Sequence, residues 1–126
     1  MRSVLVVDDE SVLAETMIMI LRQNGYLATA VRNGREAAEL IKLEPPVLVI
    51  SDLAMPVMDG LQLLEWLRDH RSMDRVKFIM MTGKENVLEP LKRHSIGADE
   101  YLSKPFSEQQ LLEKVEKLVG TPVTED

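Results

Sequence analysis

The segment VLVVDDE, residues 4–10, is the most informative about the fold. In it a short apolar run, typical of a buried strand, passes directly into three acidic residues. Apolar runs without alternation, rich in branched side chains, are typical of strands that are covered on both faces. Comparable runs occur as VLVIS at 47–51 and KFIMM at 77–81. Two weaker runs are LATAV at 27–31, a candidate edge strand, and EYLS at 100–103. We therefore expect a parallel sheet with five strands.

The segments between these strands carry helical patterns. Residues 11–23 contain a stripe at the spacing of one buried helix face. Its members are Leu13, Thr16, Met17, Ile20 and Leu21. Asn24-Gly25 then ends this helix, Asp59-Gly60 opens a later one, and a fourth helix is expected over Glu85–His94.

The second and fifth helices have N-terminal capping signals. Asn33 and Ser107 are each followed, three residues later, by Glu or Gln, which is the spacing of a capping box. Pro45-Pro46 prevents the helix that follows Asn33 from continuing. Strict alternation of strands and helices predicts an α/β fold with a doubly wound sheet and right-handed crossovers. In such sheets, ligands bind at the carboxyl ends of the strands.

Length and composition exclude several classes. The 126 residues fit one domain, and we expect residues 1–120 to form it and 121–126 to be a flexible tail. No apolar run approaches the roughly 20 residues of a membrane helix, and the absence of cysteine excludes disulfides. A net charge of -6 argues against nucleic acid binding by this domain. The first residues read directly into a strand rather than a secretory signal, so we expect a cytoplasmic location.

Acidic and basic residues gather at the predicted carboxyl ends of the strands. Asp8 and Asp9 follow the first strand, Asp52 follows the third, and Thr82 and Lys104 follow the fourth and fifth. Clustered carboxylates repel one another unless a cation neutralises them. Mg²⁺ prefers a few carboxylate oxygens together with waters. The sequence therefore predicts a divalent-cation site at this edge of the sheet.

Four segments, VLVVDDE, SDLAMPVMDG, MMTG and GADEYLSKPF, together resemble the receiver domain of bacterial two-component response regulators. The resemblance runs from Val4 to about Val119. It implies a flavodoxin-like (βα)5 fold with strand order 2-1-3-4-5. It also implies a regulatory domain rather than an enzyme acting on other substrates.

The resemblance further implies that Asp52 accepts a phosphoryl group from a sensor histidine kinase or a histidine phosphotransfer protein. Mg²⁺, with Mn²⁺ as a substitute, would be held by Asp9, Asp52 and the backbone carbonyl of Ala54, and by Asp8 through water. Lys104 would pair with the phosphoryl group. Its peptide bond to the following proline would be cis.

Two residues are expected to carry the switch. The Thr82 hydroxyl would bind the phosphoryl group, and Tyr101 would rotate inward into the vacated space. The face formed by the fourth helix, fifth strand and fifth helix would then bind a downstream protein or a fused output domain. A phosphorylation-dependent homodimer is a further expectation.

Kinase docking and the lifetime of the phosphoryl group are assigned to other positions. We expect Ala14 and Ile18, on the side of the first helix away from its core stripe, to dock a kinase helix together with Pro105 and Phe106. Ala54 cannot position an attacking water and Lys84 could contact the phosphate. Slow dephosphorylation is expected for both reasons.

Three rival classes remain open. A pseudo-receiver would share the fold but bind partners without phosphorylation. A haloacid-dehalogenase-like phosphatase would place its nucleophile in a DxDx[TV] motif after the first strand, where this chain has DDESV. A flavodoxin-like cofactor carrier would need a phosphate-cradling loop there, and DDES would instead repel phosphate.

Overall fold

The computed structural model describes residues 3–83 and 97–121. The strands are β1 (Ser3–Val7), β2 (Leu27–Val31), β3 (Leu48–Asp52), β4 (Lys77–Thr82) and β5 (Glu100–Ser103). The helices are α1 (Ser11–Gln23), α2 (Gly34–Leu43), α3 (Gly60–Arg68) and α5 (Glu108–Val119), with a 3-10 turn η1 at Arg71–Met73. The helix predicted over Glu85–His94 and position 84 lie outside the described residues.

The five strands form one parallel sheet in the order β2-β1-β3-β4-β5. This confirms the predicted doubly wound, flavodoxin-like fold and places LATAV at an edge. The chain order reverses between β1 and β3, which is the topological switch point where such sheets bind ligands. The carboxyl ends of β1, β3, β4 and β5 therefore share one edge of the sheet.

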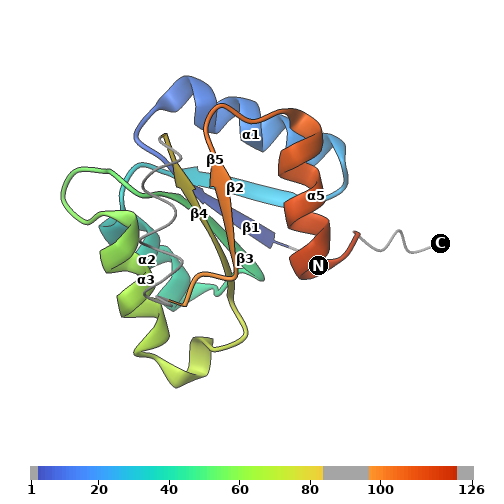
Figure 1. The fold of residues 1–126 in the computed structure, drawn as a ribbon. Helices are drawn as coiled ribbons and strands as arrows, with labels where there is room; N and C mark the ends of the chain where they lie inside the picture. Colours follow the sequence, from blue (N-terminus) through green and yellow to red (C-terminus); the bar gives the residue numbers. More distant parts are fainter. Residues whose placement is uncertain (1–2, 84–96, 122–126) are drawn as a thin grey trace.

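Helices cover both faces of the sheet. Figure 1 shows α1 and α5 on one face and α2 and α3 on the other. In β1, Val4 and Val6 belong to the core under α1 and α5, whereas Leu5 and Val7 belong to the core under α2 and α3. Because both faces are buried, successive residues of the inner strands are apolar, as the runs at 4–7 and 48–50 show.

The helix starts follow the predicted caps, with one difference. The capping box of α5 is complete, since Ser107 and Gln110 exchange both hydrogen bonds. At α2 the Asn33 side chain accepts a hydrogen bond from the Glu36 backbone N–H at 2.9 Å. The Glu36 carboxylate, however, accepts from the backbone N–H of Arg32 and not from that of Asn33. The box at Asn33 is therefore half formed.

The buried face of α1 differs from the predicted stripe by one residue. Ala14, expected on the outer side, is only 4% exposed and packs in the core with Met17 and Leu21. These residues have the i, i+3, i+7 spacing of one helix face. Thr16, expected in the stripe, is exposed and donates its hydroxyl to the Val12 carbonyl. The polar side chain turns to water, so the small Ala14 faces the sheet.

Candidate functional site

The predicted site residues come together at the carboxyl edge of the sheet. Asp8 directly follows β1, Asp52 and Thr82 are the last residues of β3 and β4, and Lys104 directly follows β5. Carboxylate oxygens of Asp8, Asp9 and Asp52 all lie within 4.8 Å of one another. Parallel pairing of β1 with β3 brings these acids together across a long stretch of sequence.

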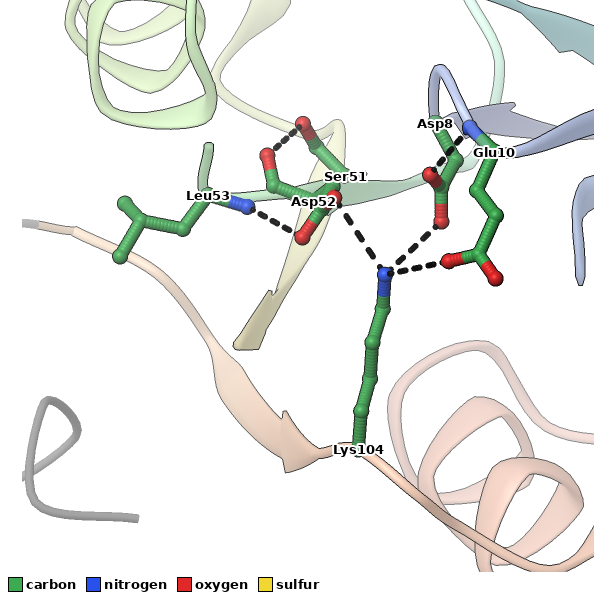
Figure 2. A network of polar contacts seen from close by, with 6 residues as sticks. All are labelled: Asp8, Glu10, Ser51, Asp52, Leu53 and Lys104. Atoms are coloured by element: carbon green, nitrogen blue, oxygen red, sulfur yellow. Dashed lines mark hydrogen bonds and ion pairs between the residues drawn. The ribbon is translucent and has the colours of Figure 1, made fainter. Parts of the chain in front are cut away.

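Lys104 points into this group of carboxylates (Figure 2). Its Nζ lies 3.1 Å from Asp8 Oδ2, 3.3 Å from Asp52 Oδ2 and 4.0 Å from Glu10 Oε1. The Asp8 side chain is fully buried, whereas that of Glu10 is 65% exposed. The ammonium group therefore supplies the positive charge that allows Asp8 to be buried as a carboxylate.

The backbone around Asp52 is held by several contacts. The Leu53 N–H donates to Asp52 Oδ1 at 3.0 Å, and the Ser51 hydroxyl donates to the Asp52 carbonyl oxygen at 2.9 Å. The N–H of Gly60, the first residue of α3, donates to the Leu53 carbonyl at 2.9 Å. A Cβ on Gly60 would lie 2.2 Å from the Asp52 carbonyl oxygen. Glycine is thus required for α3 to start this close to Asp52.

Burial and neighbouring charges have opposing effects on the pKa values of Asp52 and Lys104. Burial raises the pKa of Asp52, and the charge of Asp8 raises it further, while Lys104 opposes both effects. For Lys104, burial alone would lower the pKa, but its bonds to Asp8 and Asp52 outweigh burial and raise it. The lysine therefore stays charged, and Asp52 ionises less readily than an exposed aspartate.

The residues present fit a divalent cation. Asp8, Asp9 and Asp52 offer only oxygen ligands, the donor set that Mg²⁺ prefers. Ala54, whose carbonyl the resemblance assigns to the metal, lies two residues beyond Asp52 in an exposed turn. A hard cation here would offset the carboxylate repulsion.

Thr82 and Tyr101 lie on neighbouring strands beside the site. Thr82 is buried, and its carbonyl accepts the Lys104 backbone N–H at 2.7 Å. Tyr101 pairs with Met80 in the β4–β5 register and is partly buried against the core under α2 and α3. Burial raises the pKa of its phenol. Thr82 is thus buried at the carboxyl end of β4, and Tyr101 is partly buried on the neighbouring edge strand β5.

The residues predicted to dock a kinase are distributed over two grooves, and one of them, Ala14, is buried. Pro105 and Phe106 line a groove of about 430 Å³ beside the site, which also contains Glu10, Leu13, Gly83 and Lys104. The Lys104–Pro105 peptide bond is cis. Ile18 lies instead in a separate groove with Met19 and Arg22, and Ala14 is buried. Leu13, which the stripe assigned to the core, packs against the core and also lines the groove beside the site.

Glu10 is the site residue that the sequence interpretation did not assign. Its backbone N–H donates to Asp8 Oδ1 at 2.9 Å and its carboxylate approaches Lys104. The sequence signal for Glu10 is the acidic run at 8–10, of which it is the third member.

In residues 3–83 and 97–121, no helix combines the length and the apolar character needed to cross a membrane.

Comparison with known proteins assigns this arrangement to a family. The model of the response regulator receiver domain matches residues 4–116. The response regulator MprA of Mycolicibacterium vanbaalenii is 34% identical over 123 residues, which are 98% of this chain and 52% of that protein. The chain thus spans about half the length of this curated relative.

Solved structures show the same fold. The signal receiver domain of a signal transduction histidine kinase from Syntrophus aciditrophicus is 34% identical and superposes with a TM-score of 0.87, covering 100% of this chain and 96% of that one. The chemotaxis response regulator CheY4 of Vibrio cholerae is 27% identical with a TM-score of 0.87, covering 94% of this chain and 99% of that one.

Proposed function

This chain belongs to the response regulator receiver domain family of two-component signalling, and we propose that it is a phosphorylation switch whose acceptor is Asp52. The donor is a phosphohistidine of a sensor kinase or a histidine phosphotransfer protein. The observation that carries this proposal is the convergence of Asp8, Asp9 and Asp52 within 4.8 Å, with Lys104 3.3 Å from Asp52. A carboxylate nucleophile, acidic ligands and a cation for the transferred group are then in one place.

The residues divide the work of phosphoryl transfer. The Leu53 N–H holds Asp52 Oδ1, which fixes the orientation of the nucleophilic carboxylate. Lys104 pairs with Asp8 and Asp52 in this structure. Its ammonium group then pairs with the oxygens of the incoming phosphoryl group. Asp9, Asp52, the Ala54 carbonyl and, through water, Asp8 would hold Mg²⁺, or Mn²⁺ in its place. A bound Mg²⁺ would neutralise charge on the transferring oxygens.

Thr82 and Tyr101 would transmit the effect of phosphorylation from the site to the surface. The Thr82 hydroxyl binds a phosphoryl oxygen, and Tyr101 on the neighbouring strand follows by burying its ring more deeply. Thr82 is buried at the end of β4 and Tyr101 is partly buried on β5, so a displacement at Thr82 would change packing on the neighbouring strand. The expected output face includes β5 and α5. Its predicted fourth helix lies outside the described residues.

Partners and context are also proposals. The chain acts as a regulatory domain in the cytoplasm, with a downstream protein or a fused output domain as its target and with homodimerisation as a further output. The matched region is 52% of the relative MprA. Kinase docking uses the groove beside Pro105 and Phe106, with Leu13 in place of Ala14.

A pseudo-receiver that binds partners without phosphorylation is the alternative. It is disfavoured because the acceptor, both acidic partners and the lysine are all present and in contact range. A dehalogenase-like phosphatase is disfavoured by the sequence DDESV after β1, which lacks its nucleophile motif.

The test measures intact-protein mass after incubation with acetyl phosphate or phosphoramidate, with and without Mg²⁺. We expect a Mg²⁺-dependent gain of one phosphoryl group in the wild type and none in Asp52→Asn. Asp74→Asn, which alters an exposed aspartate after η1, is the matched control and should behave as the wild type. A folded wild type that gains no mass would support the pseudo-receiver instead.

A further inference from the structure

Glu10 stands apart from the other acids of the site. Asp8, Asp9 and Asp52 form the group that could hold a metal, and Glu10 is outside it. Its carboxylate is nevertheless 4.0 Å from Lys104 Nζ, with 65% of its side chain exposed. Figure 2 shows it reaching the ammonium from the β1–α1 turn, on the side opposite Asp52. Glu10 therefore places a negative charge at the solvent-exposed side of the site beside Lys104, which we call the mouth.

The mouth is where the departing part of a phosphodonor must lie. In phosphoryl transfer the attacking and leaving atoms are roughly in line through phosphorus. With Asp52 attacking from inside, the leaving group would point outward. A groove of about 430 Å³, lined by Lys104, lies beside the site and offers space for it. Glu10 lines this groove, and its other walls are mostly apolar: Leu13, Gly83, Pro105 and Phe106. In the described part of the chain, Glu10 and Lys104 are the charged residues that line this groove. Lys104 also pairs with Asp8 and Asp52, so it compensates Glu10 only in part.

We propose that Glu10 selects phosphodonors that carry a cationic group next to the transferable phosphoryl group, and disfavours donors that are purely anionic. The inference rests on the proposed function, because it concerns the donor used at the same site. A phosphorylated imidazole with a protonated ring, or a phosphohistidine flanked by a basic side chain, has the favoured chemistry. Attraction to the cation offsets the repulsion that Glu10 exerts on the phosphoryl oxygens.

Two small donors separate these cases. With acetyl phosphate, an Asp52 oxygen forms a bond to phosphorus, the bond from phosphorus to the acyl oxygen breaks, and its electron pair leaves on acetate. With phosphoramidate, the bond from phosphorus to a protonated nitrogen breaks, and the pair leaves on ammonia. The first donor has no cationic group, whereas the second carries one at the atom that leaves beside Glu10.

The experiment compares phosphorylation rates with both donors, followed by intact-protein mass in Mg²⁺ at low ionic strength. The proteins are the wild type, Glu10→Gln and Glu15→Gln. Glu15→Gln removes the same charge from an exposed position of α1 outside the groove, so it controls for net charge. We expect Glu10→Gln to raise the ratio of the acetyl phosphate rate to the phosphoramidate rate about threefold to tenfold. Glu15→Gln should leave the ratio unchanged, and high salt should shrink the Glu10 effect.

The outcomes are distinguishable. If the wild type is phosphorylated but Glu10→Gln leaves the ratio unchanged, or Glu15→Gln changes it equally, the role of Glu10 is overturned and the proposed function stands. If the folded wild type accepts phosphate from neither donor, the proposed function fails and this inference fails with it.

Discussion

Lys104 Nζ lies 3.3 Å from Asp52 Oδ2 and at the same time 3.1 Å from Asp8 Oδ2. The lysine therefore bridges two carboxylates that belong to different strands, and one of them is fully buried. In this position the ammonium serves stability and function together, because it compensates a buried charge and stands next to the proposed nucleophile.

Lys104→Met should destabilise the fold, because it leaves Asp8 buried without a cation. We expect a loss of about 2–4 kcal/mol in the free energy of unfolding, measured by urea denaturation in the presence of a chelator. Mg²⁺ should restore more stability to this variant than to the wild type, since a bound cation replaces the missing charge.

Lys42→Met is the matched control, because Lys42 is exposed on α2. It should have little effect on stability, with or without Mg²⁺. A Lys104→Met protein whose loss is the same in Mg²⁺ and in chelator would contradict the proposed cation site.

Gly60→Ala should disturb Asp52 directly. The added Cβ would meet the Asp52 carbonyl oxygen at 2.2 Å and the Met80 sulfur at 2.9 Å, so α3 must move. We expect a loss of about 1–3 kcal/mol and a slower gain of phosphate by the remaining folded protein. Urea denaturation and intact-mass time courses measure the two effects.

Gly83→Ala provides the control for stability, because a Cβ there meets nothing within 4 Å. An equal loss in both variants would show that the contact with the Asp52 carbonyl does not explain the result.

Glu100 should make stability depend on acid pH. Burial alone would raise its pKa, but hydrogen bonds from Lys114 and Lys117 lower it to about 2 from an ordinary value of 4.5. The unfolded chain therefore takes up the proton first as pH falls. The contribution of Glu100 is present above about pH 4.5 and is lost progressively as pH falls towards 2.

Glu100→Gln should thus lose about 1–2 kcal/mol at pH 6 and nearly nothing at pH 2. Urea denaturation across this range measures the difference. Glu39→Gln, whose carboxylate lies 4.0 Å from Arg35 on the exposed face of α2, is the control and should differ little from the wild type at any pH. A constant difference at Glu100 would contradict the ion-pair explanation.

Val57→Gly should stabilise the protein. Val57 has a φ of 70° and its side chain is 72% exposed, so a β-branched residue is strained there without burying apolar surface. Glycine adopts this φ without strain, although it gains freedom in the unfolded chain. We expect a net gain of about 0.5–1 kcal/mol in chemical denaturation. Val12→Gly, at an exposed position inside α1, should instead lose stability. Equal losses in the two variants would show that position 57 is not strained.

Local sequence signals predicted most of the elements because those signals are themselves local. The capping pair Ser107 and Gln110 starts α5 as expected, and the run at 100–103 forms β5 with the predicted bounds. The prediction that Ala14 lies on the outer side of α1 was wrong, because Ala14 is buried. Hydrophobic spacing alone allows one apolar stripe that includes position 14 and another that does not. Only contact with the sheet decides between them.

Local signals in the sequence predict the order of strands and helices along the chain, and they identify the acids and the lysine that follow the strands. Apolar runs, turn residues and caps act over a few residues, so they can be read along the chain. Long-range packing sets which groups meet: Glu10 approaches Lys104, Gly60 approaches the Asp52 carbonyl, and Leu13 and Phe106 line one groove. These contacts depend on strand register and on how each helix rests on the sheet, because packing of segments far apart in the chain sets both.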